Sequence, residues 1–289
     1  MMNKKIFSSK KFIFFSVFTV ILIAVVIWIV IGNISVEVNK YRICSERVPK
    51  SFSGFRIAQI SDLHNAEFGR DNKSLLQKLK DSDPDIIVIT GDLIDSRNTR
   101  IDVALSFVKE ALEIAPVYYV SGNHEARIDE FHRLIDGLIS AGVTFLDNEA
   151  VTIEVGGEKI FLAGINDPAF FENYDTDFSQ SMLKEFTDSI DFDEECFSIL
   201  LTHRPEGLDI YADRGFDLVF SGHVHGGQIR LPFVGGLFGP NQGFFPKYDS
   251  GVFTYGKTQM VVSRGLGNSL FPFRVNNMPE IVIADLVSE

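Results

Sequence analysis

Five of the six histidines in this chain follow short apolar runs, and four of these five stand beside asparagine or glycine. In chain order, the polar clusters are Asp62-Leu63-His64, Gly91-Asp92, Gly122-Asn123-His124-Glu125, His203, and Gly222-His223-Val224-His225. Carboxylate, imidazole and amide oxygen without a thiolate suit Mn, Fe, Zn or Co better than Cu(I) or an iron–sulfur cluster. The clusters therefore predict a site for divalent transition metals.

The spacing within two clusters makes the prediction more specific. Asp62 and His64 are separated by one residue, and two such side chains point to the same side of an extended segment. The same spacing relates His223 and His225. Spacing alone therefore predicts that each pair binds one ion. The sixth histidine, His132, falls in a helical pattern, where we expect a surface position.

Each cluster taken alone also has an ordinary structural explanation. A D-x-H sequence is common by chance, an aspartate before a helix can be an N-cap, and an asparagine can be a turn residue. A single histidine at a strand end is more often structural than catalytic. All five clusters in this order, each after an apolar run, favour a functional site.

The apolar runs before the clusters have the composition of buried strands. They cover residues 55–61, 85–90, 116–121, 197–202 and 216–221. Because ligands of open α/β sheets bind at the carboxyl ends of the strands, we expect the five clusters to converge on one edge. Residues 259–263 and 280–286 also fit strands, and 151–164 fit a hairpin that turns at Gly156-Gly157.

Helical periodicity appears between these strands, around residues 75–79, 101–112 and 131–139. Helix–strand alternation indicates an α/β fold, and the hairpin adds antiparallel character. We therefore expect a mixed-sheet sandwich. No Pro- or Gly-rich linker divides residues 37–289, which predicts one domain.

Residues 12–31 form a run of 20 residues without a charge, long enough to cross a bilayer. The run exceeds the apolar core of a cleavable signal peptide and lacks a small-residue cleavage site. We therefore predict that residues 1–36 are a cytoplasmic tail and a single-pass anchor in the cell membrane. Four lysines precede the span and four basic residues follow it closely. The leading lysines favour an extracytoplasmic domain.

The charge distribution bears on the partners. Four of the 27 basic residues and none of the 39 acidic ones lie in residues 1–36, so the rest of the chain carries a net charge of −16. Such a surface repels a nucleic-acid backbone, and we expect no nucleic-acid partner. The two cysteines, Cys44 and Cys196, form no CxxC motif, and a disulfide framework is not expected.

The series D-x-H, G-D, G-N-H-E, H and G-H-x-H resembles that of the calcineurin-like metallophosphoesterases. The anchor, with THRPE (202–206), GHVHGGQIRLP (222–232) and SRGLGNS (263–269), is similar to the bacterial membrane-associated phosphodiesterase branch. That branch is similar to enzymes that cleave a nucleotide-diphospho-lipid. The resemblance implies a metallophosphoesterase-type sandwich of two mixed β-sheets flanked by helices, with two metal ions such as manganese.

The resemblance also implies a role for each residue. One ion would be bound by Asp62, His64, Asp92 and His225, and the other by Asp92, Asn123, His203 and His223. Asp92 would bridge the ions, and His124 would face the substrate without binding metal. Hydroxide between the two ions would attack the phosphorus of a phosphodiester or phosphoanhydride, and His124 would protonate the leaving oxygen.

The sequence allows two roles for several residues near the predicted ligands. Glu125 either orients His124 or only sits in the turn, and Asp95 either bonds a metal ligand or caps the next helix. Arg204, Arg264 and Arg274 stand near Gly- and Pro-rich loops and can clamp a second phosphate, whereas at least one is expected to be an ordinary surface arginine. We select Arg264 as substrate-binding. The apolar loop 231–246 either packs on the core or forms a lip for a lipid-linked substrate.

Three alternative functions remain open from the sequence. A membrane-tethered metal-binding module without activity would not need His124. A phosphomonoesterase or phosphoprotein phosphatase would use the same ligands on another substrate. A nuclease is disfavoured by the acidic charge and the lack of a basic stripe.

Overall fold

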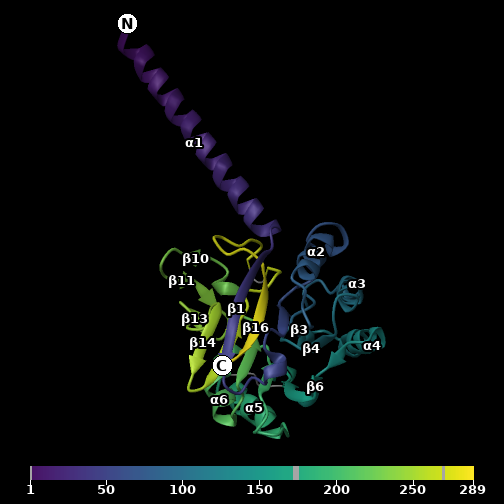
Figure 1. The fold of residues 1–289 in the computed structure, drawn as a ribbon. Coiled ribbons are helices and arrows are strands. Elements are labelled where there is room, and N and C mark those ends of the chain that lie inside the picture. The colour runs from purple at the N-terminus through teal and green to yellow at the C-terminus, as the bar shows by residue number, and fades with distance from the viewer. Residues whose placement is uncertain (1, 172–175, 269–270) are drawn as a thin grey trace.

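Two six-stranded sheets pack face to face in the computed structural model, which describes residues 2–171, 176–268 and 271–289 (Figure 1). The first sheet has the order β1 (Glu37–Ser45), β16 (Glu280–Ser288), β2 (Arg56–Ile60), β3 (Ile86–Thr90), β4 (Val117–Val120), β5 (Thr144–Phe145). The second has the order β14 (Gly251–Tyr255), β15 (Thr258–Val262), β9 (Leu218–Ser221), β8 (Ser198–Leu201), β7 (Glu158–Gly164), β6 (Glu149–Val155).

Both sheets are mixed. Strands β2 to β5 run parallel, while β16 is antiparallel to β2 and parallel to β1. In the second sheet β7, β8, β9 and β15 run parallel, with β6 and β14 antiparallel at the edges. The expected sandwich of two mixed sheets is confirmed, as is the hairpin formed by β6 and β7.

Helices cover the outer face of each sheet. The helices α2 (Lys73–Asp81), α3 (Ile101–Leu112) and α4 (Phe131–Ala141) cover the first sheet, and α5 (Thr176–Ser189) and α6 (Leu208–Arg214) cover the second. Strand β3 shows why the central strands are apolar throughout. Its Ile86 and Val88 pack between the sheets, whereas Ile87 and Ile89 pack under the helices. Both faces of the strand are buried, so no polar alternation remains.

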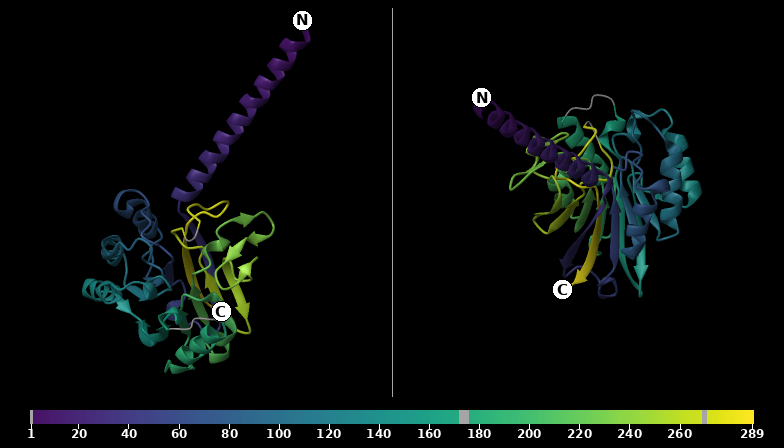
Figure 2. Two further views of the ribbon diagram at one scale, coloured as in Figure 1. Left: turned by 180° about the vertical axis from the view of Figure 1, so that it is seen from behind. Right: turned by 90° about the horizontal axis from the view of Figure 1, so that it is seen from above.

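Helix α1 (Met2–Ile34) projects away from the sandwich (Figures 1 and 2). Its segment Lys11–Ile34 is long and apolar enough to cross a membrane. The end of the helix is bonded to the domain, because the Asn33 side chain donates to the Arg274 carbonyl at 2.9 Å and accepts from the Arg274 backbone N–H at 2.7 Å. The helix therefore meets the domain at a defined place.

Sheet topology fixes which edge of the sandwich α1 joins. Strand β1 starts three residues after α1 ends and runs parallel to β16, which is antiparallel to β2. The carboxyl ends of β2, β3 and β4 therefore lie at the edge where β1 begins. We call this the α1 edge, and Figure 1 shows it beneath the lower end of the helix.

The apolar loop 231–246 lies at the same edge. Short strand pairs shape it, namely β10 (Arg230–Leu231) with β11 (Gly235–Gly236) and β12 (Phe238–Gly239) with β13 (Gly243–Phe244). Hydrogen bonds connect the start of this loop to the loop that contacts α1. The Arg230 backbone N–H donates to the Val275 carbonyl, and the Gln228 side chain donates to the Phe271 and Phe273 carbonyls. Its large apolar side chains are mostly exposed rather than packed on the core; they are Leu231, Phe233, Val234, Phe244 and Phe245.

Candidate metal centre

Four of the expected ligands gather into one buried group at the α1 edge. The group contains Asp62, His64, Asp92 and His225, and one ligand atom from each lies within 4.8 Å of the others. His225 Nε2 is 3.2 Å from both Asp62 Oδ1 and His64 Nε2. His64 Nε2 is 3.6 Å from Asp92 Oδ2. These nitrogen and oxygen atoms point their lone pairs at one another, and a cation bound between them would offset the repulsion. We call these residues the first ligand group.

The remaining expected ligands lie against the other side of Asp92. His203 Nε2 is 3.3 Å from Asp92 Oδ2, and His223 Nδ1 is 3.1 Å from His203 Nε2. The Asn123 side-chain oxygen is buried without a hydrogen-bond partner. Burying an unbonded amide oxygen is unfavourable, so this atom fits a bound cation. Asp92, Asn123, His203 and His223 form the second ligand group, and Asp92 Oδ2 is placed to bridge the two.

The protonation of the cluster also fits metal binding. Burial lowers the pKa of His64 to about 3 and holds the pKa values of His223 and His225 well below the usual range. Neutral imidazole is the form that coordinates metal. Burial also disfavours the charged form of His203, but Asp92 and Asp62 outweigh it and raise the pKa of His203 to about 10. A metal ion at this place would displace that proton.

The backbone at the ligands is left-handed rather than extended. The φ angles are 52° at Asp62, 49° at His64, 52° at Asp92, 72° at His223 and 50° at His225. Residues other than glycine adopt such angles at a cost of about 1–3 kcal/mol each, and they cluster at functional sites. The expectation from extended spacing is therefore wrong for His223 and His225, which enter different groups. Asp62 and His64 do enter the same group, but a turn of the backbone brings them together rather than an extended segment.

Two glycines let the loops approach the carboxylates closely. A Cβ atom at Gly222 would clash with the Asp62 carboxylate, and one at Gly122 would clash with the Asp92 carboxylate. Any other residue at either place would push a ligand loop away. This close packing explains why glycine precedes the ligand in both the G-H-x-H and G-N-H sequences.

Glu125 holds two ligand loops together. Its buried carboxylate accepts backbone N–H bonds from Asp92, Leu93, Ile94 and Gly122 at 2.8 to 3.2 Å. Burial and the nearby Asp92 raise the pKa of Glu125 to about 7, against the effect of these N–H donors. Glu125 therefore sits in the turn rather than orienting His124, and its hydrogen bonds connect the Asp92 loop to the Asn123 loop.

His124 lies beside the ligands but outside the first ligand group. Its ring centroid is 4.4 Å from that of His64, and its Nδ1 accepts the Ser96 backbone N–H at 3.0 Å. A neutral imidazole in this arrangement carries its proton on Nε2, ready to donate. The Asp95 carboxylate lies 3.5 Å from Nδ1 and pairs with Arg97. Asp95 therefore contacts His124 and does not cap α3, whose N-cap is Arg100.

The three arginines are all buried or nearly so, which makes the expectation of an ordinary surface arginine wrong. Arg204 pairs with the buried Asp167. The Arg264 guanidinium lies 2.7 Å from a Glu37 carboxylate oxygen and 2.8 Å from a Glu280 oxygen. Arg274 donates to the Arg264 and Gly267 carbonyls, and its Nη2 lies 3.3 Å from His225 Nδ1.

Sequence reasoning missed Asn241. Its side-chain oxygen lies 3.0 Å from His223 Nε2 and 2.9 Å from Arg204 Nη1. When His223 carries its proton on Nε2, the Asn241 side-chain oxygen accepts a hydrogen bond from that N–H, and Nδ1 is left facing His203. Asn241 lies in the turn between the short strands β12 and β13, which the sequence did not predict. Two adjacent amides, Asn241 and Gln242, inside the apolar loop 231–246 are the signal that was present.

The Calcineurin-like phosphoesterase family matches residues 55–227 of this chain. The chain is 31% identical over 258 residues to the metallophosphoesterase YkuE of Bacillus subtilis (strain 168), which covers 88% of this chain and 86% of that protein. It is 28% identical over 244 residues to phosphodiesterase YaeI of Escherichia coli (strain K12), covering 81% and 82%.

A mammalian relative is also similar. The protein from Bos taurus named transmembrane protein with metallophosphoesterase domain is 28% identical over 241 residues, which cover 75% of this chain and 53% of that protein. The family match and the bacterial relatives agree with the ligand series and the sandwich fold. The chain therefore belongs to the calcineurin-like metallophosphoesterases, a family of phosphoester hydrolases that use divalent metals.

Proposed function

We propose that this protein is a membrane-anchored hydrolase that cleaves a phosphodiester or phosphoanhydride with two divalent metal ions. The observation that carries the proposal is the pair of buried ligand groups that share Asp92, together with the buried, unbonded Asn123 oxygen and with His124 beside His64. A purely structural metal site would not need a histidine that lies next to its ligands without binding the metal. This favours catalysis over a metal-binding module.

The proposed ligands follow the two groups. Asp62, His64, Asp92 and His225 would bind one ion, and Asp92, Asn123, His203 and His223 the other. Two such ions would supply positive charge to the phosphate oxygens and activate a water for attack on phosphorus. Manganese, iron, zinc and cobalt all suit this donor set.

The protein's own groups have separate tasks. Asp62 Oδ2 accepts from the Ser61 hydroxyl at 2.6 Å and from the His223 backbone N–H at 3.1 Å, which leaves Oδ1 toward His225. Asp92 Oδ1 accepts the His124 backbone N–H at 2.8 Å, which leaves Oδ2 toward the other ligands. In its imidazolium form, His124 would give its Nε2 proton to the departing oxygen of the ester and return to the neutral form.

A relative and one arginine bear on the substrate class. The relative YaeI is named a phosphodiesterase, which favours a diester for this chain as well. Arg264 stays our proposal for a substrate-binding residue. Because Glu37 and Glu280 already hold its guanidinium, a substrate phosphate would have to compete with two carboxylates.

The surroundings of the metal centre favour a lipid-linked substrate. Seven exposed apolar side chains lie on the two loops at the α1 edge, and we call them the apolar rim: Leu231, Phe233, Val234, Phe244, Phe245, Phe271 and Phe273. If α1 crosses the bilayer, the rim and the ligand groups both face the membrane surface. We propose a single-pass cell-membrane protein whose domain lies outside the cytoplasm and acts on amphiphilic phosphates.

The reaction class can be tested with the full chain in detergent, stripped of metal and resupplied with Mn²⁺. We expect cleavage of bis(p-nitrophenyl) phosphate to exceed cleavage of p-nitrophenyl phosphate. Faster cleavage of the monoester would assign a phosphomonoesterase instead. No cleavage of either by folded, metal-loaded protein would favour the binding module.

The role of the rim needs a separate comparison. Phe244→Ser and Phe245→Ser should weaken cleavage of a lipid-linked diphosphate and spare the soluble diester. Val252→Ser, which changes an exposed apolar side chain on β14, serves as the control. Equal losses on lipid and soluble substrates would count against a lipid-linked substrate.

A further inference from the structure

A cavity of about 200 Å³ lies where α1 meets the domain. Its lining comes from the last turns of α1 and from the loops beside the metal centre: Trp28, Ile29, Gly32, Glu37, Arg264, Arg274, Asn276, Asn277 and Met278. We call it the α1-foot cavity. A water occupies about 30 Å³ of liquid, so the volume holds about six waters or one polar headgroup of similar size.

Arg274 gives this cavity an unpaired positive charge. Its side chain is 1% exposed, and its Nε has no hydrogen-bond partner. Among the residues that the structure describes, no carboxylate oxygen lies within 4.0 Å of its guanidinium, in contrast to Arg264 with its two carboxylate partners. An arginine guanidinium stays charged at neutral pH. A buried cation without a counter-ion is costly, and an anion in the cavity would offset that cost.

The position of the cavity along α1 indicates the source of such an anion. Trp28, Ile29 and Gly32 belong to the last turns of the apolar segment Lys11–Ile34. The end of a membrane span lies at the level of the lipid headgroups, where tryptophan is enriched. The cavity therefore opens at the depth of the lipid phosphates in one leaflet.

We propose that the α1-foot cavity binds the phosphate group of an anionic membrane lipid, with Arg274 as the residue that recognises it. The Nη1 and Nη2 groups of its guanidinium already donate to the Arg264 and Gly267 carbonyls, so the Nε–H, which has no partner, is the donor left for a phosphate oxygen. Glu37 is the one acidic residue among the lining residues, and it weakens the site for an anion. The proposal goes beyond the hydrolase activity and depends only on the anchoring of α1 in the bilayer.

Arg274 also connects this cavity to the metal centre. Its Nη2 lies 3.3 Å from Nδ1 of His225, and its backbone is bonded to Asn33 of α1. A lipid phosphate on Arg274 is thus one side chain away from the first ligand group. The arrangement places an anionic lipid beside the centre that we propose to cleave lipid-linked phosphates.

The single tryptophan of the chain provides the probe, because Trp28 lines the cavity. The full chain is reconstituted in phosphatidylcholine vesicles that contain a small fraction of lipid with brominated acyl chains, either phosphatidylglycerol or phosphatidylcholine. Bromine quenches tryptophan fluorescence at short range. We expect brominated phosphatidylglycerol to quench Trp28 as strongly as if its fraction beside Trp28 were about fivefold higher than its fraction in the vesicle. Fivefold is the factor expected for one basic side chain at an anionic surface.

Three variants separate the site from general attraction of anionic lipid. Arg274→Gln should abolish the enrichment, whereas Arg42→Gln, which removes the same charge from an exposed position on β1, should leave it unchanged. Glu37→Gln removes the carboxylate from the lining and should raise the enrichment. This last variant keeps the test valid if Arg274→Gln fails to fold.

The outcomes that would overturn the proposal are distinct from failure of the anchor. Equal quenching by the two brominated lipids would exclude a specific anionic lipid site, as would equal effects of Arg274→Gln and Arg42→Gln. No quenching by either lipid would instead disprove membrane anchoring. Inorganic phosphate tests the other source, and a Trp28 shift with phosphate but no enrichment of phosphatidylglycerol would overturn the lipid assignment.

Discussion

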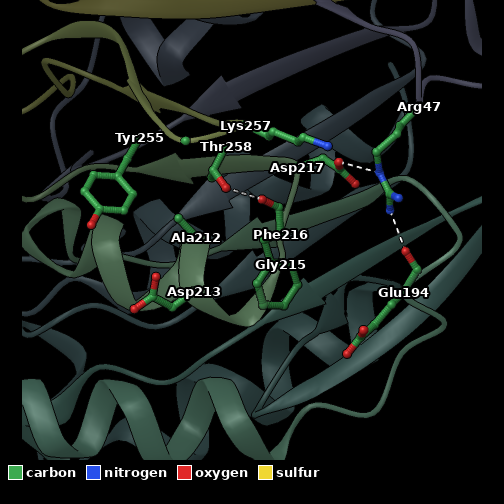
Figure 3. A pocket seen from close by; sticks show the side chains of 11 residues that line it. Arg47, Glu194, Ala212, Asp213, Gly215, Phe216, Asp217, Tyr255, Lys257 and Thr258 are labelled. Carbon is green, nitrogen blue, oxygen red and sulfur yellow. Dashed lines mark hydrogen bonds and ion pairs between the residues drawn. The ribbon is translucent and has the colours of Figure 1, made fainter.

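The two ends of the sandwich differ in how their polar groups are satisfied. At the edge opposite α1, a cavity of about 380 Å³ is lined by Arg47, Asp217 and Lys257 among others (Figure 3). There Arg47 Nε lies 2.6 Å from an Asp217 carboxylate oxygen, and Asp217 also accepts the Ser198 backbone N–H at 2.9 Å. At the α1 edge, by contrast, imidazole nitrogens and carboxylate oxygens face one another, and Asn123 Oδ1 has no partner.

The contrast shows that the size of a cavity does not locate the chemistry of this protein. In the larger cavity Arg47 pairs with Asp217, and the backbone is not left-handed at either residue. The α1 edge combines ligand residues in left-handed backbone conformations with buried polar atoms that have no protein partner. Substitutions at the two edges should therefore affect different properties.

The largest effect is expected from Asp92→Asn. Asp92 Oδ2 faces His64 at 3.6 Å and His203 at 3.3 Å, so an amide there removes a charge from both ligand groups. We expect turnover of the diester to fall to background and bound metal to decrease. Metal analysis and initial rates on the same preparations would check this. Unchanged turnover would remove Asp92 from the centre.

His124→Ala should also be severe, but for another reason. Loss of a general acid costs about 10²- to 10⁴-fold in kcat. Because His124 is outside the first ligand group, the variant should retain its metal. A leaving group that needs no proton should recover much of the lost rate. A variant that loses metal in parallel with activity would show that His124 is a ligand.

Asn241→Ala should have a smaller effect, confined to the second ligand group. Loss of a partner behind a metal-binding histidine typically weakens metal affinity about 10- to 100-fold. We expect two binding steps in a metal titration, of which only the weaker one shifts. Gln242→Ala is the control, since that side chain bonds the Tyr248 backbone instead. Identical titrations of Asn241→Ala and wild type would argue against the Asn241 contact with His223.

Arg47→Met at the opposite edge should change stability only slightly. The Arg47 side chain is 36% exposed, so solvent screens its pair with Asp217 and the loss is about 1 kcal/mol or less. Denaturant unfolding measures this loss, and kcat for the diester should stay unchanged. A large fall in kcat with normal stability would show that the opposite edge also takes part in catalysis.

The sequence allowed most of the sheet architecture to be predicted, because buried strands carry a strong signal. Strands such as β3 are apolar on both faces, and each polar cluster directly follows such a strand. The strand β1 was missed since it lies at the sheet edge and exposes Lys40 and Arg42, which hide its strand character. The helix α6 was missed because it has only seven residues.

The candidate site was predictable in composition but not in geometry. Side-chain spacing assumes extended backbone, and the left-handed angles at His223 and His225 send these neighbours into different groups. Only the family resemblance placed them separately. The contact of Asn241 with His223 depends on how a long loop folds back over the second sheet, and no local pattern encodes it.

The number of metal ions that the intact protein binds is the most direct test of the proposed centre. The full chain in detergent is stripped with a chelator and titrated with Mn²⁺, while bound metal per chain and diester cleavage are measured together. We predict two ions per chain, with full activity only after the second binds, and a loss of both sites in Asp92→Asn. Folded protein that cleaves the diester at full rate with no bound metal would contradict the central claim.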